Sequence, residues 1–164
     1  MRSCLKIRNP QVPDNFDQTK IGKIEKATQG IDSRWRGLSR GEEVYVVSIP
    51  GFAKLKGERD EVLENLAVSN IDLQDKLYQQ LDYKDYEKTV GEQKYYCYEL
   101  QTEVDITLVS ITAYGGRFYG AFVTAPLRKY EDDKGKYERI IDSFSIIEKK
   151  NAALEERLTI LANS

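Results

Sequence analysis

The sequence predicts an α+β fold in which one antiparallel β-sheet lies between helices, in three layers. Two β-rich runs, 105–114 and 117–125, are joined only by Gly115-Gly116. Adjacent glycines supply the positive φ angles of a primed two-residue turn, so the two runs form a tight hairpin. Both faces of this hairpin are apolar, whereas a strand pair with one solvated face alternates between apolar and polar residues. Each face therefore needs a covering layer.

The turn sets the register of the hairpin. Tyr114 is expected opposite Arg117, and the next pairs on the same ladder follow from that one. One face of the ribbon then carries Val109, Ile111, Ala113, Phe118, Gly120 and Phe122, and the other carries Ile106, Leu108, Thr112, Tyr119, Ala121 and Val123.

Helices on both sides of the hairpin in sequence are predicted to supply the two covers. After it, apolar residues recur at helical spacing at 137, 140, 141 and 144, with charged residues between them. Before it, 59–67 and 72–81 are candidate helices, with Asp72 as N-cap of the second. Leu73, Leu77 and Leu81 are expected on the buried side of that helix.

The remaining strands and the domain boundaries follow from turn residues. Residues 43–49 form a strand ended by Pro50-Gly51, and 83–90 and 94–103 form a second hairpin around Gly91-Glu92. We expect the main domain over 43–147 and a carboxyl-terminal helix over 148–164. Residues 1–42 read as a loop-rich amino-terminal segment that is either an extension or part of the domain.

Composition excludes several classes of function. With 25 basic and 27 acidic residues, the net charge of −2 gives no strong field for nucleic acid. The absence of histidine excludes Ser-His-Asp and Cys-His catalysis and histidine metal sites. No apolar run is long enough to span a membrane, and the first residues lack the apolar core of a secretory signal. We therefore expect a soluble chain that carries no targeting segment.

No residue is predicted to be catalytic, to bind a cofactor or to ligate a metal. Cys97 lies in a strand pattern and is interpreted as a small buried residue. Asp132-Asp133 could bind a divalent cation, but adjacent acids at a helix start more often favour the helix dipole. The 11 tyrosines could stack on a base or pigment, although rings on a sheet are more often core and rim.

Two stretches are candidates for docking a partner. The single tryptophan lies between two cations in Arg34-Trp35-Arg36 and could anchor an interface. Alternatively, Trp35 fills the core while the arginines reach solvent. In the expected carboxyl-terminal helix, Leu154, Leu158 and Leu161 form one apolar stripe, which can pack on its own domain or lie on a partner.

The hairpin and helix block resembles the carboxyl half of the PsbP family. The similarity rests on Lys94-Tyr-Tyr-Cys-Tyr-Glu-Leu100, on Ser110-Ile-Thr-Ala-Tyr-Gly-Gly-Arg-Phe-Tyr119 and on a charged helix that ends in Ile141-Asp-Ser-Phe-Ser-Ile-Ile147. The family has a "YY.YE" strand, a strand ending in "NGKLY" and a helix closing on "SF.V". Upstream of residue 94 the match is loose, so the roles of the family's amino-terminal segment are not carried over.

The resemblance implies a PsbP/Mog1-like α-β-α fold and a protein of the chloroplast or cyanobacterial thylakoid lumen, peripheral to the membrane. It implies no enzyme, but an accessory subunit or assembly factor that binds a photosynthetic complex: photosystem II, photosystem I or an NADH-dehydrogenase-like complex. Metal sites in the family use histidine, which this chain lacks. The alternative is a protein that holds a pigment, lipid or quinone between sheet and helix.

Overall fold

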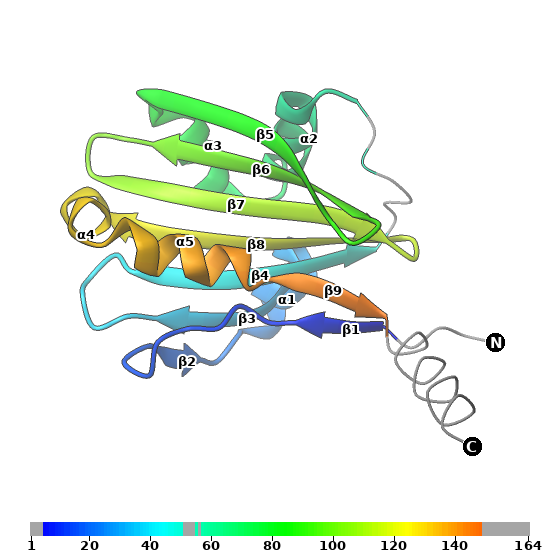
Figure 1. Ribbon diagram of the computed structural model, residues 1–164, viewed down its shortest axis with the longest axis horizontal. Coiled ribbons are helices and arrows are strands. Elements are labelled where there is room, and N and C mark those ends of the chain that lie inside the picture. The colour runs from blue at the N-terminus through cyan, green and yellow to red at the C-terminus, as the bar shows by residue number, and fades with distance from the viewer. Residues whose placement is uncertain (1–4, 51–54, 56, 149–164) are drawn as a thin grey trace, which may run out of the picture.

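A seven-stranded antiparallel sheet forms the centre of the protein (Figure 1). The computed structural model describes residues 5–50, 55 and 57–148. The strand order is β2-β3-β4-β8-β7-β6-β5. The strands are β2 (Asp17–Thr19), β3 (Ile31–Arg36), β4 (Glu43–Pro50), β5 (Asp82–Val90), β6 (Gln93–Gln101), β7 (Asp105–Tyr114) and β8 (Arg117–Pro126). A separate antiparallel pair joins β1 (Leu5–Arg8) to β9 (Ser145–Glu148).

Helices cover both faces of this sheet, as predicted. In Figure 1 helices α4 (Leu127–Asp132) and α5 (Lys134–Asp142) lie in front of the sheet, with β1 and β9. Helices α1 (Lys23–Gln29), α2 (Arg59–Ala67) and α3 (Ile71–Gln79) lie behind it. The predicted α+β class and the α-β-α layering are therefore confirmed.

The β7–β8 hairpin has the predicted turn and register. Tyr114 pairs with Arg117, and Ile111 with Gly120. Gly115 and Gly116 have φ angles of 58° and 77°, the left-handed region that a primed turn requires. Gly120 lies in a tight space, because a Cβ there would lie 3.0 Å from the side chain of Ile111.

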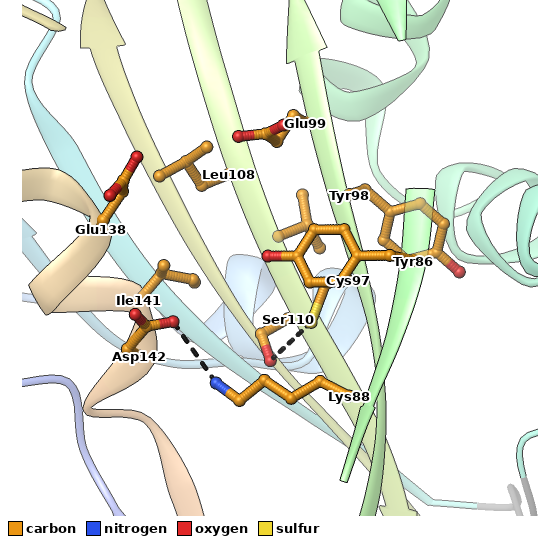
Figure 2. A pocket seen from close by; sticks show the side chains of 11 residues that line it. Tyr86, Lys88, Cys97, Tyr98, Glu99, Leu108, Ser110, Glu138, Ile141 and Asp142 are labelled. Atoms are coloured by element: carbon orange, nitrogen blue, oxygen red, sulfur yellow. Dashed lines mark hydrogen bonds and ion pairs between the residues drawn. The ribbon is translucent and has the colours of Figure 1, made fainter. Parts of the chain in front are cut away.

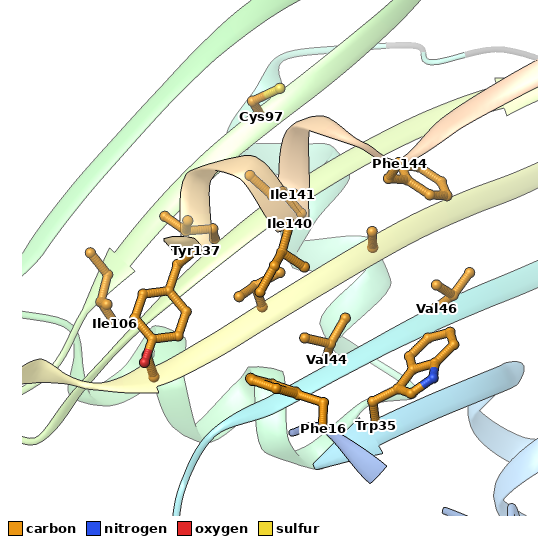
Figure 3. Close-up of a cluster of buried hydrophobic side chains, with 14 of the residues drawn as sticks. Phe16, Trp35, Val44, Val46, Cys97, Ile106, Tyr137, Ile140, Ile141 and Phe144 are labelled. Atoms are coloured by element: carbon orange, nitrogen blue, oxygen red, sulfur yellow. The ribbon is translucent and has the colours of Figure 1, made fainter. Parts of the chain in front are cut away.

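Two separate core clusters lie on the two faces of the hairpin. Behind the sheet, a set that includes Val109, Ile111 and Phe122 packs against the buried residues of α2 and α3. In front, the apolar stripe of α5 and Phe144 meet the other face (Figure 3). The front cluster includes Leu108, Ala121, Val123, Tyr137, Ile140, Ile141 and Phe144. The sheet is thus filled on both sides by side chains of its own chain.

Two details of α3 differ from the prediction. The N-cap is Asn70 rather than Asp72, because the Asn70 side chain accepts a hydrogen bond of 3.1 Å from the Leu73 backbone N–H. Leu73 is buried and Leu77 packs on the core, as expected. Leu81 is 67% exposed, since the helix ends at Gln79 and the chain turns away from the core before Leu81.

The amino-terminal residues contribute strands to the sheet. Strand β3 pairs with β4, and β2 pairs with β3, so the ladder runs across the expected boundary between 1–42 and 43–147. Strand β1 pairs with β9, which ends at Glu148. The structure describes the chain up to Glu148, so the predicted helix over 148–164 lies outside the described residues from position 149 on.

A buried carboxylate ties the β3–β4 connection to α5. The Glu42 side chain is 3% exposed and accepts hydrogen bonds from the Tyr137 hydroxyl at 2.9 Å and from Lys136 Nζ at 3.1 Å. The Ser39 backbone N–H donates to its other oxygen at 3.3 Å. Burial by itself raises the pKa of Glu42, but these donors outweigh burial and lower the pKa below its usual value.

We expect Glu42→Gln to lower the free energy of unfolding by about 1–3 kcal/mol near neutral pH, because Lys136 loses a buried charged partner. A carboxylate whose pKa is lower in the folded state stabilises the protein above its unfolded-state pKa. That contribution is lost as the pH falls through the folded-state pKa. We expect urea titrations from pH 7 down to about pH 3 to show this. The difference in the free energy of unfolding between Glu42→Gln and the unsubstituted protein should shrink as the pH falls.

Glu138→Gln is the matched control, because Glu138 lies exposed on the same helix. Glu138→Gln should change the free energy of unfolding by no more than about 0.5 kcal/mol. A difference between Glu42→Gln and the unsubstituted protein that does not change with pH would contradict the assigned role of the carboxylate.

Candidate functional site

A groove opens between α5 and the β5–β6 edge of the sheet. Helix α5 packs across β7 and β8, which leaves the front side of β5 and β6 partly uncovered. The groove has a volume of about 280 Å³. Its lining comes from three strands and one helix: Tyr86, Lys88, Cys97, Tyr98, Glu99, Leu108, Val109, Ser110, Glu138, Ile141 and Asp142 (Figure 2).

Cys97 and Ser110 form part of the floor of this groove. They are paired residues on β6 and β7, with 3.9 Å between Cys97 Sγ and Ser110 Oγ. The Tyr86 ring comes from β5 and lies beside the thiol, and an ion pair of 3.3 Å between Lys88 and Asp142 joins β5 to α5 (Figure 2). The ring and the ion pair therefore limit access to the thiol.

The electrostatics of the groove do not activate a nucleophile. Burial raises the pKa of the Cys97 thiol above its ordinary value. Burial likewise raises the pKa of Tyr86 to about 12. Both groups are therefore protonated at neutral pH, and a thiol reacts as its thiolate. The arrangement favours binding over covalent chemistry.

A second hollow continues the groove toward α4. Its volume is about 260 Å³, and Glu99 and Glu138 line both hollows. Lys84, Lys134 and Asp82 add charges of both signs to its walls. Pockets for organic ligands usually occupy about 300–1,000 Å³ and are mostly apolar. A charged groove of this size suits the side chains of a polypeptide better than a pigment, lipid or quinone.

The structure separates the three residues of the Arg34-Trp35-Arg36 stretch. Trp35 is 9% exposed and packs in the front core cluster, close to Phe16 and Val44 (Figure 3). This placement agrees with the alternative in which the tryptophan fills the core. Arg34 is largely buried on the other face and pairs with Glu25 at 3.4 Å, while Arg36 reaches solvent beside Glu43.

The remaining predicted site residues are either not described or have a structural role. Leu154, Leu158 and Leu161 lie outside the described residues, so their docking role stays a prediction. Asp133 accepts a hydrogen bond of 3.1 Å from the Lys136 backbone N–H and so caps α5. Among the described residues no group of three cysteine or acidic side chains could hold a metal ion. No helix in the described part of the chain has the length and apolar character of a membrane span.

Sequence reasoning missed the groove and the Glu42 network. Cys97 and Ser110 meet through strand pairing, and Asp142 reaches Lys88 from a distant helix. The alternation Lys84, Tyr86, Lys88 along β5 was the available signal, because it places these side chains on one face of an edge strand.

We expect Cys97 to react slowly with a water-soluble disulfide reagent in the folded protein, because the thiol is buried and protonated. In a Cys4→Ser background, Tyr86→Ala should raise the reaction rate about tenfold by opening the groove. Tyr83→Ala is the matched control, because Tyr83 is on the same strand but packs in the rear core cluster. Equal rates in the two variants would show that Tyr86 does not shield the thiol.

Comparison with known proteins identifies a sequence relative and a solved structure with a similar fold. No family model matches the chain. The chain is 30% identical over 144 residues to the thylakoid lumenal 19 kDa protein, chloroplastic, of Arabidopsis thaliana. The match covers 83% of this chain and 60% of that protein, so the chain spans less than two thirds of its relative.

The fold is similar to the solution structure of cyanobacterial PsbP (CyanoP) from Synechocystis sp. PCC 6803. The TM-score is 0.62 at 17% sequence identity, and the match covers 90% of this chain and 95% of that chain. At this identity the likeness concerns the fold, which agrees with the fold that the hairpin and helix block implied. Together with the relative, it confirms the resemblance to the PsbP family and the thylakoid-lumen location expected from it.

Proposed function

We propose that this protein is a non-catalytic accessory subunit or assembly factor that binds a photosynthetic membrane complex from the lumenal side. Photosystem II, photosystem I and an NADH-dehydrogenase-like complex are the candidate partners. The observation that carries the proposal is the PsbP fold in a chain whose sequence relative is a thylakoid lumenal protein.

The chemistry of the described residues supports binding over catalysis. The chain contains no histidine, and the Cys97 thiol in the groove is kept protonated by burial. Burial also raises the pKa of Tyr86, Tyr130 and Tyr137, so these phenols stay protonated at neutral pH and are not available as general bases. Hydrogen bonds from neighbouring side chains lower the pKa values of the carboxyl groups of Glu42 and Asp85. Both therefore serve the fold.

Filled cores on both sides of the sheet also favour docking through the outer surface. Val44, Val46, Ile111 and Phe122 are fully buried, so side chains of the protein itself occupy the middle of both clusters. The outer surface of the described residues offers the polar groove, further polar hollows and exposed loops. Such surfaces suit contact with another protein.

We expect the protein to comigrate with a membrane complex when gently solubilised thylakoids are separated on a native gel and probed with a specific antibody. Adding salt before solubilisation should release part of it, because charged groups at the rim of an interface are screened by salt. An exclusively free pool at low salt, in membranes from cells grown in light and in darkness, would contradict the proposal.

A further inference from the structure

One end of the central sheet carries an unusual share of exposed apolar side chains. The strand register places Arg36, Glu43, Gln101, Asp82 and Asp105 at the same end. The connections at this end contain Leu38, Leu81 and Val104, which are 77%, 67% and 71% exposed. Tyr78, in the last turn of α3, is 91% exposed. Four of the nine exposed large apolar residues in the described part of the chain therefore lie here.

Backbone hydrogen bonds fix the two connections that carry Leu81 and Val104. The Leu81 N–H donates to the Gln101 carbonyl at 2.8 Å, which fixes the entry to β5 against the end of β6. The Val104 carbonyl accepts from the Leu127 N–H at 2.9 Å. Tyr78 lies three residues before Leu81. We call Tyr78, Leu81 and Val104 the sheet-end patch. Leu38 lies at the same end of the sheet, on the far side of Pro126 at the end of β8.

The fold does not require apolar residues at these positions. The core contacts of α3 come from Leu73 and Leu77, while Tyr78 in its last turn and Leu81 after its end are exposed. Isolated exposed apolar residues are ordinary in soluble proteins, but a group on one rigid surface marks an interaction site. An aromatic side chain beside aliphatic ones is also the usual composition of the centre of an interface.

The charges around the sheet-end patch indicate a protein partner. Asp82 follows Leu81 and Glu103 precedes Val104; both acids are exposed and no ion pair joins them to other described residues. Arg128, exposed on α4, lies one residue after Leu127. A lipid surface presents mainly one sign of charge and would meet Asp82 and Glu103 unfavourably. A protein surface can match both signs position by position.

We propose that the sheet-end patch is the surface through which the protein docks on the membrane complex. The proposal rests on the function proposed above and specifies its contact surface. The partner presents an apolar hollow for Tyr78, Leu81 and Val104. A basic residue of the partner faces Asp82 and Glu103, and an acidic residue faces Arg128. Figure 1 shows this end of the sheet beside α4, away from β1 and β9.

The test adds purified full-length protein to thylakoid membranes that lack it, followed by native gel electrophoresis. Leu81→Ser/Val104→Ser should lower the comigrating fraction at least about tenfold, since each truncation removes a central apolar contact. Ile24→Ser/Val90→Ser is the matched control, because both residues are exposed and lie elsewhere. The control should comigrate like the unsubstituted protein. Thermal unfolding followed by circular dichroism checks that both variants fold.

Two further outcomes separate the possible failures. If the unsubstituted protein comigrates and the patch variant does so equally, the sheet-end patch is not the docking surface, while the proposed function stands. If the unsubstituted protein never comigrates, the proposed function itself fails. Vesicles of phosphatidylglycerol and a neutral lipid provide the other control. Sedimentation with them that depends on Leu81 and Val104 would assign the patch to lipid and overturn the proposal.

Asp82→Lys/Glu103→Lys tests the expected charge pattern. If a basic group of the partner faces these acids, the charge-reversed variant should associate about tenfold more slowly than the unsubstituted protein at low salt. The difference between the two association rates should become smaller as salt is added. Unchanged binding at every salt concentration would show that the acids do not face the partner.

Discussion

The burial of the β7–β8 hairpin on both faces is the constraint that organises this protein. Ile111 and Phe122 are inaccessible on one face, and Ala121 is inaccessible on the other. Neither strand offers a polar side to water over its central residues, so the hairpin is stable only inside three layers. Helix α5 follows it directly and supplies the front cover, whereas α2 and α3 come from earlier in the chain.

This packing also determines where the protein can interact. Side chains of the protein itself fill both clusters, which favours binding at the periphery of the sheet. Two peripheral features are candidates: the polar groove along β5 and the apolar sheet-end patch. The groove is built on strands held by long ladders, and the patch lies beside the ends of those strands, so a partner would meet a surface that is already ordered before binding.

The sequence predicted the parts that depend on local patterns. Gly115-Gly116 determined the register, and the helical spacing of Tyr137, Ile140 and Ile141 identified the front cover. Contacts between distant segments carried no local signal. Glu42 meets Lys136 across 94 positions, and the face on which Trp35 lies depends on a register shift between Ile31 and Ser33. Asn70 caps α3 although Asp72 has an equally suitable side chain, because the turn after α2 places Asn70 at the helix start.

Native-state hydrogen exchange tests the central claim most directly. If the β7–β8 hairpin is enclosed on both faces, the backbone amides of Val109, Ile111 and Phe122 should exchange only when the whole domain unfolds. Their opening free energies should then equal the global free energy of unfolding, while amides of the edge strands β2 and β5 open at lower cost. Exchange of the hairpin amides at rates equal to those of β2 and β5 would contradict the enclosed hairpin.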